Sequence, residues 1–402
     1  MNFKQLQHRI LLLTAAVSIL IAMSVRMHAD TGMCDGSSIT LPFTDVQAGS
    51  VFFCSIAEAY FSGLTNGTSA TTYDPSQPVP REQMAAFVTR TMDQSLKRGS
   101  RRAALDHWWT VTDPGALRAV SLNATAVPHD IVCDGLDLWI SDENARVFRV
   151  RASDGTLLGT WTGATGARGL IAAAGRIFVA ADLGSANPGK IYVINPEAAP
   201  GPVSVFENDT GAQPFEITFD GANLWTANPQ SGSISRVNVG TLVDSTFTGF
   251  TNPVNILWDG TSLWVNDFGH VERLDPNNAT VLESIPVTGG KMRFDGANIW
   301  LSNANVSANS ITVVRATGPL HGTILATLTG NGMFRPYGMA FDGERMLVGN
   351  LDNSNSVSLF SATTFAPLGN VFLGANAEPR SACSDGVNFW ICRYFHHDIV
   401  RL

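Results

Sequence analysis

Short apolar runs alternate with polar, glycine-rich turns over most of the chain, and one turn phrase recurs. In its complete copies it reads Asp-Gly, two variable residues, an apolar residue and tryptophan, as in Asp220–Trp225. The phrase begins seven times, at Asp134, Ala174, Asp220, Asp259, Asp295, Asp342 and Asp385. A spacing of roughly 40 residues indicates a repeat architecture in which each copy is one supersecondary unit.

Each copy predicts four short β-strands. Around the turn at Asp220, β-branched and aromatic runs cover Glu216–Phe219 and Leu224–Ala227, and two more runs follow at Ser233–Val237 and Ser245–Phe250. The glycine of the turn supplies the positive φ that a tight hairpin requires. Four strands in roughly 40 residues are typical of one β-propeller blade. We therefore expect a mainly all-β fold, with a seven-bladed propeller over residues 115–402.

The two ends of the repeat region predict how the ring closes. The last copy supplies three strands before Leu402. A further strand-like run, Leu117–Leu122, precedes the first copy. We expect this run to complete the last blade, because a closed ring leaves no unpaired strand edge.

Tryptophans return at one blade position, namely Trp139, Trp225, Trp264, Trp300 and Trp390. Packing between neighbouring blades is the favoured interpretation, because an aromatic ring buries a large apolar area. A ring of ligand-stacking aromatic side chains is the alternative.

Composition limits the class of partner. Charged residues make up only 15% of the 402 residues and hydrophobic residues 45%, which excludes a disordered or coiled-coil chain. The formal net charge of −8 argues against nucleic acid as a partner. We expect the propeller to be monomeric.

Residues 1–29 predict a signal peptide. Lys4 and Arg9 precede a run of apolar or small residues, Ile10–Met23, which is too short for a comfortable transmembrane helix. We therefore expect an exported protein, secreted or located in the cell envelope outside the cytoplasmic membrane. An uncleaved N-terminal anchor is the alternative.

Residues 30–97 predict a small helical module, and residues 98–114 predict a linker. Val51–Gly63 carries a helical stripe that includes Ile56 and Ala57. A second helix is expected over Arg81–Lys97, opened by Pro80.

The chain has five cysteines. Cys34 and Cys54 flank one small segment of a chain expected to be exported, so they are a disulfide candidate. The odd total leaves at least one free thiol. The pairing of Cys133, Cys383 and Cys392 stays open.

The N-terminal module resembles a known family. Phe43-Thr44-Asp45-Val46, Gly63, Gly67, Tyr73-Asp74-Pro75 and Pro78–Phe87 are similar to a surface-layer homology (SLH) module. The resemblance implies docking onto cell-wall glycan, with Arg81 at the place of the polymer-contacting arginine. Pro80 stands where the family has a threonine, and one module is visible where tight anchoring in the family usually uses three. A helical cap retained for folding or secretion is the alternative.

A candidate ligand site follows from the expected ring. The innermost strands of a propeller line its channel, and one face gathers the loops that lead into them. Residues at or just before the start of the expected inner strands are His129, Arg168, Lys291, Arg335, Tyr337 and Arg380. Their basic side chains at one channel mouth would suit an anionic group.

A second polar series lies three residues after the aromatic blade position. Its members include Asn228, Asp267, Asn303, Asn350 and Arg393. Asp and Asn can bond the backbone of their own turns, which is the structural interpretation. The functional interpretation is a polar ring at the channel mouth that binds a ligand. No cofactor is expected, although a divalent cation at the channel is an open alternative.

No catalytic residue and no metal ligand can be assigned. The chain has neither a G-x-S-x-G elbow nor an H-E-x-x-H helix. The repeats look like NHL/YVTN-type bacterial propellers, a group that includes streptogramin lyase-like proteins. That lyase group typically carries a glutamate just after the strand with the blade aromatic, where this chain has Asp, Ala or Asn. The resemblance thus implies a fold more than a reaction.

Two functions from different classes remain. The first is an exported, envelope-associated binding or scaffold protein, whose SLH-like module contacts cell-wall glycan and whose propeller binds a protein, glycan or small ligand on its looped face. The second is an enzyme, a metal-assisted lyase or a lactonase-like hydrolase, with its site at the channel mouth. An enzyme should bring histidines or carboxylates together within hydrogen-bond or metal-ligand reach.

Overall fold

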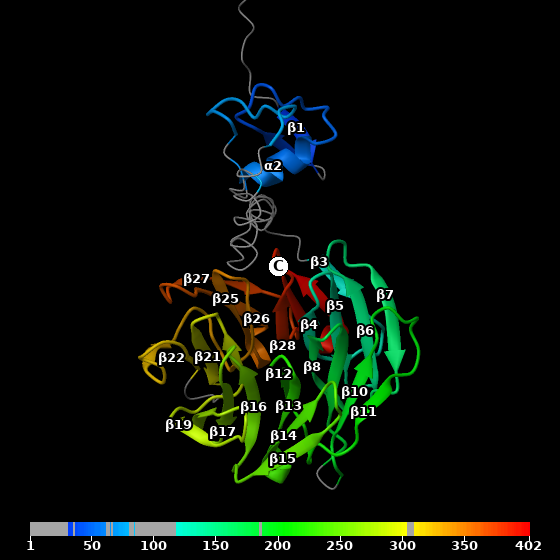
Figure 1. Ribbon diagram of the computed structural model, residues 1–402, viewed down its shortest axis with the longest axis vertical. Coiled ribbons are helices and arrows are strands. Elements are labelled where there is room, and N and C mark those ends of the chain that lie inside the picture. Colours follow the sequence, from blue (N-terminus) through cyan, green and yellow to red (C-terminus); the bar gives the residue numbers. More distant parts are fainter. Residues whose placement is uncertain are drawn as a thin grey trace, which may run out of the picture. The chain divides into compact units, whose positions relative to one another are not determined.

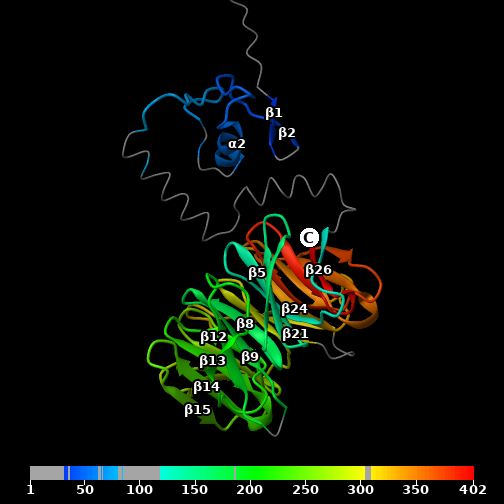
Figure 2. The same ribbon diagram turned by 90° about the vertical axis from the view of Figure 1, so that its right-hand side faces the viewer.

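Figures 1 and 2 show the computed structural model, which describes residues 31–34, 37–61, 65, 67–79, 84, 118–184, 187–303 and 309–402. The chain forms two compact units, Met1–Gln94 and Ser95–Leu402. The expected signal peptide and linker lie outside the described residues. So does the expected second helix, apart from Met84.

The N-terminal unit combines a hairpin with a helix. Strands β1 (Thr31–Cys34) and β2 (Ser37–Thr40) pair antiparallel, and α2 (Phe53–Phe61) lies inside the range expected for the first helix. The hairpin was not predicted, because strands of four residues are too short to show a period. Cys34 and Cys54 form a disulfide that joins β1 to α2, with their Cα atoms 5.6 Å apart.

The residues that carry the SLH resemblance contact one another. The Asp45 carboxylate accepts hydrogen bonds from the backbone N–H of Tyr73, at 2.9 and 3.1 Å, and of Asp74, at 2.7 Å. The buried Phe43 ring packs against Tyr60 and Tyr73, with ring centroids 5.0 and 5.4 Å away. These contacts tie the segment around Asp45 to the Tyr-Asp-Pro segment and to α2.

The second unit is a seven-bladed β-propeller made of seven four-stranded antiparallel sheets (Figure 1). With strands given from the innermost outward, the first blade has β4 (Pro128–Cys133), β5 (Asp137–Asp142), β6 (Arg146–Arg151) and β7 (Leu157–Thr162), and the second has β8 (Ala167–Ala173), β9 (Arg176–Ala181), β10 (Lys190–Ile194) and β11 (Ser204–Glu207). The third blade has β12 (Glu216–Phe219), β13 (Asn223–Asn228), β14 (Ser233–Asn238) and β15 (Asp244–Thr248), and the fourth has β16 (Pro253–Trp258), β17 (Leu263–Asp267), β18 (His270–Leu274) and β19 (Val281–Ile285). The fifth blade has β20 (Met292–Phe294), β21 (Asn298–Asn303), β22 (Ser310–Arg315) and β23 (Ile324–Leu328), and the sixth has β24 (Pro336–Phe341), β25 (Arg345–Asn350), β26 (Ser356–Ser361) and β27 (Pro367–Phe372).

The seventh blade joins the two ends of the propeller, as expected. It consists of β28 (Pro379–Ser384), β29 (Phe389–Arg393), β30 (Asp398–Arg401) and, as its outermost strand, β3 (Arg118–Ser121). The pairing of β3 with β30 is antiparallel and runs from Arg118 opposite Arg401 to Ser121 opposite Asp398. The early strand thereby covers an edge that β30 would otherwise expose.

Seven hydrophobic clusters hold the ring together, one between each pair of neighbouring blades. The blade tryptophans lie inside them: Trp139 packs with Leu170 of the second blade, and Trp390 with Ile131 of the first. All five of these tryptophans are at most 1% exposed. This confirms packing between blades and removes the stacking-ring alternative, because buried rings offer no face to a ligand.

Glycine allows the inner strands to approach closely around the axis. A Cβ atom at Gly338 on β24 would lie 2.3 Å from the carbonyl oxygen of Arg380 on β28. A Cβ atom at Gly169 on β8 would lie 2.9 Å from the carbonyl oxygen of Phe215. Any larger residue would push these blades apart, so the two glycines set the spacing of the side chains beside them.

Candidate functional site

The sheet register brings both predicted polar series to one face of the propeller. The first residue of an inner strand lies opposite the last residue of the next strand, as for Pro253 and Asp267 or Pro379 and Arg393. Residues at the start of the inner strands and residues three positions after the blade aromatic are therefore neighbours. The two series differ in their contacts: the second series bonds mainly within its own blades, whereas most of the first series meets at the ring axis.

The second series is engaged in the loops of its own blades. The Asp267 carboxylate accepts the backbone N–H groups of Thr251, at 2.8 Å, and Asn252, at 2.5 Å. Asn228 is buried and donates to Ser235 Oγ at 2.9 Å. Asn350 is also buried and donates to Ser358 Oγ at 3.0 Å. The Asp267 contacts cap the backbone of its turn, as in the structural interpretation, whereas the amides of Asn228 and Asn350 bond serine hydroxyls on the adjacent strand of the same blade.

The other members of the second series, and Arg335 of the first, lie at the same face. Arg393 donates to Asp398 from Nε at 2.8 Å and to the carbonyl oxygen of Leu373 at 2.7 Å. Arg335 pairs with Asp352. Asn303 is the last residue of β21. These contacts of Arg393 and Arg335 are made to nearby loops and not across the ring.

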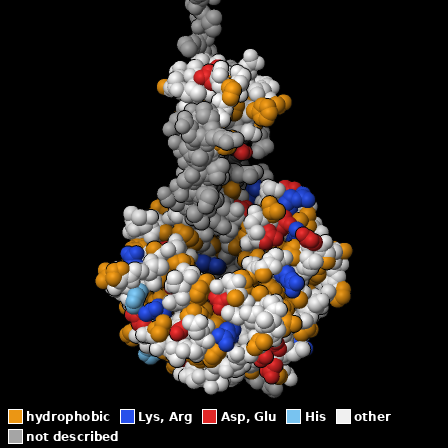
Figure 3. All heavy atoms as spheres, in the orientation of Figure 1, with side chains coloured by type: hydrophobic (Ala, Val, Ile, Leu, Met, Phe, Trp, Pro, Cys, Tyr) orange, Lys and Arg blue, Asp and Glu red, His pale blue; other side chains and the backbone are white. Residues whose placement is uncertain are grey.

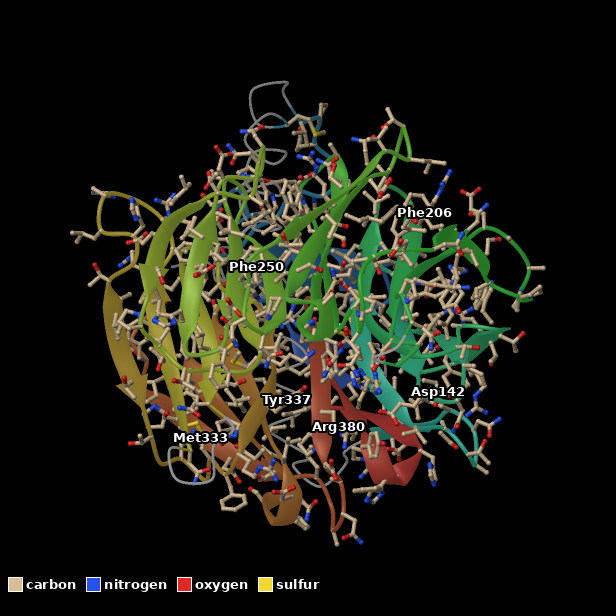
Figure 4. The ribbon with its side chains drawn as sticks, turned by 90° about the horizontal axis from the view of Figure 1, so that it is seen from below. Asp142, Phe206, Phe250, Met333, Tyr337 and Arg380 are labelled. Atoms are coloured by element: carbon tan, nitrogen blue, oxygen red, sulfur yellow. A yellow bond between two sulfur atoms is a disulfide. The ribbon has the colours of Figure 1, made fainter. Side chains whose placement is uncertain are left out.

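Five of the predicted residues lie at the ring axis, on or directly before the innermost strands of five blades. We call them, together with Glu216, the axial cluster: His129, Arg168, Glu216, Lys291, Tyr337 and Arg380. Figure 4 shows Tyr337 and Arg380 on the inner strands β24 and β28. Lys291 of the fifth blade forms an ion pair with Glu216 of the third. Blades that are not neighbours can meet in this way only across the axis, so the side chains converge there.

A network of charges connects the first, second and seventh blades at the mouth. Arg168 Nη1 donates to Glu143 Oε1 at 2.7 Å, and the hydroxyl of Tyr394 donates to Glu143 Oε2 at 2.8 Å. Arg380 donates to Glu378 at 2.8 Å, and its guanidinium lies 3.6 Å from the centre of the Tyr394 ring. Glu143 is thus held by two blades besides its own, across the seam where the ring closes.

His129 is the most enclosed member of the axial cluster, at 4% exposure. Its ring lies edge-on to Phe215, with centroids 5.8 Å apart. The pKa of His129 is well below its ordinary value, first because burial disfavours the charged ring and then because Lys291, Arg168 and Arg380 repel a further positive charge. His129 is therefore neutral at physiological pH.

Lys291 is a cation with a perturbed pKa. Burial lowers the pKa of its amine to about 8; Asp130 acts against this shift and Arg293 in the same direction. Its Nζ atom lies 5.6 Å from the centre of the Tyr337 ring, and burial raises the pKa of that phenol. The site thus combines a weakly held proton on Lys291 with a neutral tyrosine.

Sequence reasoning missed the acidic half of the site. Glu143 and Glu216 pair with the predicted basic residues, and Asp130 accepts the backbone N–H of Leu170 at 3.1 Å and the hydroxyl of Ser381. Two signals were present: Glu216 opens an inner strand, and Glu143 directly follows the second strand of its blade.

The described residues contain no group of three or more His, Cys, Asp and Glu side chains placed to hold a metal ion. The adjacent His396 and His397 each contact a backbone carbonyl oxygen, that of Ala375 at 2.7 Å and that of Ala126. Cys133, Cys383 and Cys392 form no disulfide in the described part of the chain. Within the described ranges, no helix has the length and apolarity needed to cross a membrane.

Figure 3 shows acidic and basic side chains in small, intermingled groups over the displayed face. No broad area of one sign is visible on it. Long-range attraction of a polyelectrolyte requires such an area. The largest group of charged side chains described above is the axial cluster, which is local.

No protein-family model matches the chain. A "Cell surface protein" of Thermoanaerobacter kivui is 31% identical over 86 residues, which are 19% of this chain and 11% of that protein. The chain therefore spans about a tenth of that relative's length, and the match is compatible with a place in the cell envelope.

Two solved structures are similar to the propeller. The Kuenenia stuttgartiensis hydrazine synthase is 17% identical with a TM-score of 0.57, covering 72% of this chain and 99% of that chain. The WD40 β-propeller domain of Doa1 is 12% identical with a TM-score of 0.56, covering 71% and 95%. At such identities the likeness shows the fold alone. The chain carries a seven-bladed β-propeller.

Proposed function

We propose that this chain is an exported, envelope-associated binding protein. In the proposal an SLH-like N-terminal module contacts a cell-wall glycan, and a propeller of the NHL/YVTN type binds a ligand on its looped face. The observation that carries the binding function is the axial cluster, to which inner strands or adjoining residues of six blades contribute: the first, second, third, fifth, sixth and seventh.

Binding is favoured over catalysis by the state of the acidic groups. Glu143, Glu216 and Glu378 are each engaged by an arginine or a lysine. A general base needs a carboxylate or histidine within hydrogen-bond reach of the proton it removes. The three glutamates are ion-paired, and the one histidine of the cluster, His129, is buried among three cations, an arrangement that suits recognition of an anionic ligand better than proton transfer.

The wall-contact part of the proposal rests on the family resemblance, on the contacts that join Asp45 to Tyr73, and on the match to a cell surface protein. Between α2 and the Tyr-Asp-Pro segment lies an open groove of about 340 Å³, lined by Phe52, Ser55, Ile56, Tyr73 and Pro75. An aromatic face at such a groove suits the carbon face of a sugar ring. Arg81, the proposed polymer contact, lies outside the described residues.

Co-sedimentation of the full chain with purified cell walls tests this function. We expect Arg81→Ala to lower the bound fraction severalfold, because a charge-assisted contact to the polymer is lost. Arg151→Ala is the matched control, since Arg151 is a half-exposed propeller arginine whose pair with Asp154 lies at the surface. Equal loss in both variants, or no loss in Arg81→Ala, would reject the proposed wall contact.

A further inference from the structure

The axial cluster contains polar atoms without partners among the described residues. The buried Nδ1 atom of His129 and the buried Nε atom of Arg168 have no hydrogen-bond partner there, and neither has Oε1 of Glu216, which is in an ion pair with Lys291. Buried polar groups in folded proteins are nearly always satisfied, so each exception calls for an explanation. Nε of arginine can only donate, and Nδ1 of a neutral histidine donates in one of its two tautomers. Both atoms are thus suited to a ligand that accepts hydrogen bonds.

The cations of the cluster have donors to spare. Lys291 carries three N–H bonds and Arg168 five. Lys291 forms an ion pair with Glu216, and Arg168 forms ion pairs with Glu143 and Asp182. An ion pair neutralises charge but leaves the unused N–H groups available. These N–H groups are donors that a ligand with oxygen acceptors can use.

The charges that act on His129 have the sign that attracts an anion, although Glu143, Glu216 and Glu378 pair with the same cations. The charges that repel a proton from His129 are those of Lys291, Arg168 and Arg380. The same repulsion of a positive charge is attraction for a negative one. Low exposure strengthens the effect, because the Lys291 side chain is only 12% exposed and water screens it little.

Aromatic faces stand beside these donors. The Phe215 ring lies 5.6 Å from the guanidinium of Arg168 and 5.8 Å from the His129 ring. The Tyr337 ring lies against Lys291. A flat or ring-shaped carbon skeleton attached to the anion would pack on these faces. Arg168 and Arg380 stay 25% and 29% exposed, so the cluster can be reached from solvent.

We propose that the axial cluster binds the oxyanion group of a small ligand, a carboxylate or a phosphate, through Lys291, Arg168 and His129. The inference rests on the proposed function, because it names the chemistry of the ligand that the looped face takes. Lys291 and Arg168 supply charge-assisted hydrogen bonds. His129 donates from Nδ1 as a neutral ring.

Calorimetric titration of the full chain with sugars that differ only in charge tests the inference. The probes are galacturonate, which carries a carboxylate, glucose 6-phosphate, which carries a phosphate, and the neutral sugars galactose and glucose. We expect at least one charged sugar to bind at least tenfold more tightly than its neutral counterpart. Comparing the two charged probes identifies which oxyanion fits. Binding of the neutral sugars as tight as that of the charged ones, or no heat from either charged sugar at millimolar concentration, overturns the inference.

Two variants locate the binding. Lys291→Met is expected to weaken binding of the charged sugar at least tenfold, while Lys190→Met at the start of β10 leaves it unchanged. Arg168→Gln is the second variant, in case loss of Lys291 leaves Glu216 unpaired and the ring unfolds. Its control is Arg273→Gln, which removes an arginine paired with Glu283 in a blade without axial members. Binding that survives in both Lys291→Met and Arg168→Gln places the ligand elsewhere and refutes the assignment.

The outcome is separable from that of the proposed function. If the chain sediments with cell walls through Arg81 but binds no charged sugar, the proposed envelope function stands and the oxyanion site is refuted. If the chain binds a charged sugar through Lys291 but does not sediment with cell walls, the oxyanion site stands and the wall contact is refuted.

Discussion

At the residue scale, the recurring aspartate forms hydrogen bonds both to its own turn and to the tryptophan in the core between blades. In the copies at Asp134, Asp220, Asp259, Asp295 and Asp385, Oδ1 accepts backbone N–H groups of the turn, and Oδ2 accepts the indole N–H of the blade tryptophan at 2.7 or 2.8 Å. A buried indole needs such an acceptor. The repeated phrase thus fixes the hairpin and orients the ring that packs on the next blade.

Replacing Asp259 with alanine tests these hydrogen bonds. The variant removes the acceptor of the fully buried Trp264 Nε1 and of the N–H groups of Thr261 and Ser262. An unsatisfied buried donor costs about 1–3 kcal/mol, so we expect a loss of that size in the free energy of unfolding, measured by urea denaturation. In a Trp264→Phe background, which has no indole N–H, the same change should cost less.

The control for this prediction lies in the same blade. Asp275 also caps a turn. Its Oδ1 atom accepts the backbone N–H of Asn277 at 2.9 Å and the side-chain amide of the same residue at 2.8 Å, and both bonds lie in an exposed loop. We expect Asp275→Ala to change stability by no more than about 0.5 kcal/mol. Equal losses in the two variants would show that turn capping alone, and not the indole contact, accounts for the recurring aspartate.

What the sequence could reveal at this scale depended on how local the interaction is. The glycine after each aspartate was predictable as a positive-φ residue, and Gly221 has φ of 103°. The bond from Asp220 to Trp225 was not predicted, although the two residues are five positions apart, because it exists only once the hairpin has formed. The pairing of Lys291 with Glu216 joins blades that the sequence separates by more than one repeat, so only the closed ring reveals it.

At the element scale, β3 closes the ring with backbone bonds and one apolar side chain. It is paired with β30 over its four residues, and Val120 packs against the cluster between the seventh and first blades. The sequence predicted this pairing because closure is a requirement of the whole ring, and one unassigned strand stood where one was missing.

Deleting residues 118–121 should therefore destabilise the propeller and expose the edge of β30. With a net value near 1 kcal/mol for each ladder hydrogen bond, we expect a loss of roughly 2–4 kcal/mol. In a domain of this size that is a fall of about 5–15 °C in melting temperature, followed by scanning fluorimetry. The freed edge should also promote association, seen as larger species in size-exclusion chromatography.

Val120→Ala separates the two contributions of β3. This variant keeps the strand backbone and shortens only the side chain that packs on the core cluster, so we expect a smaller loss than the deletion causes and no new association. A deletion no more harmful than Val120→Ala would mean that the backbone pairing of β3 contributes little to closure.

At the scale of the whole molecule, the chain consists of two compact units stabilised by different means. The propeller buries seven apolar clusters, whereas the described part of the N-terminal unit is small and carries the Cys34–Cys54 disulfide. Small modules with little core depend on such cross-links. The three cysteines of the propeller lie in or against one core cluster and form no disulfide among the described residues. A reductant therefore has no disulfide to break in the described part of the propeller.

A reductant should therefore affect one unit and spare the other. The disulfide joins residues 20 positions apart, and closing a loop of that length contributes about 3 kcal/mol, so reduction should lower the melting temperature of the N-terminal unit. Seven of the nine tryptophans of the chain lie in described strands of the propeller and none lies in the N-terminal unit, so tryptophan fluorescence reports mainly on the propeller. With dithiothreitol we expect calorimetry to show an earlier first transition while the fluorescence melt stays in place, and Cys34→Ser with Cys54→Ser should reproduce that result without reductant. A fluorescence melt that shifts together with the calorimetric transition would mean that the two units unfold as one, and their separate treatment would then be wrong.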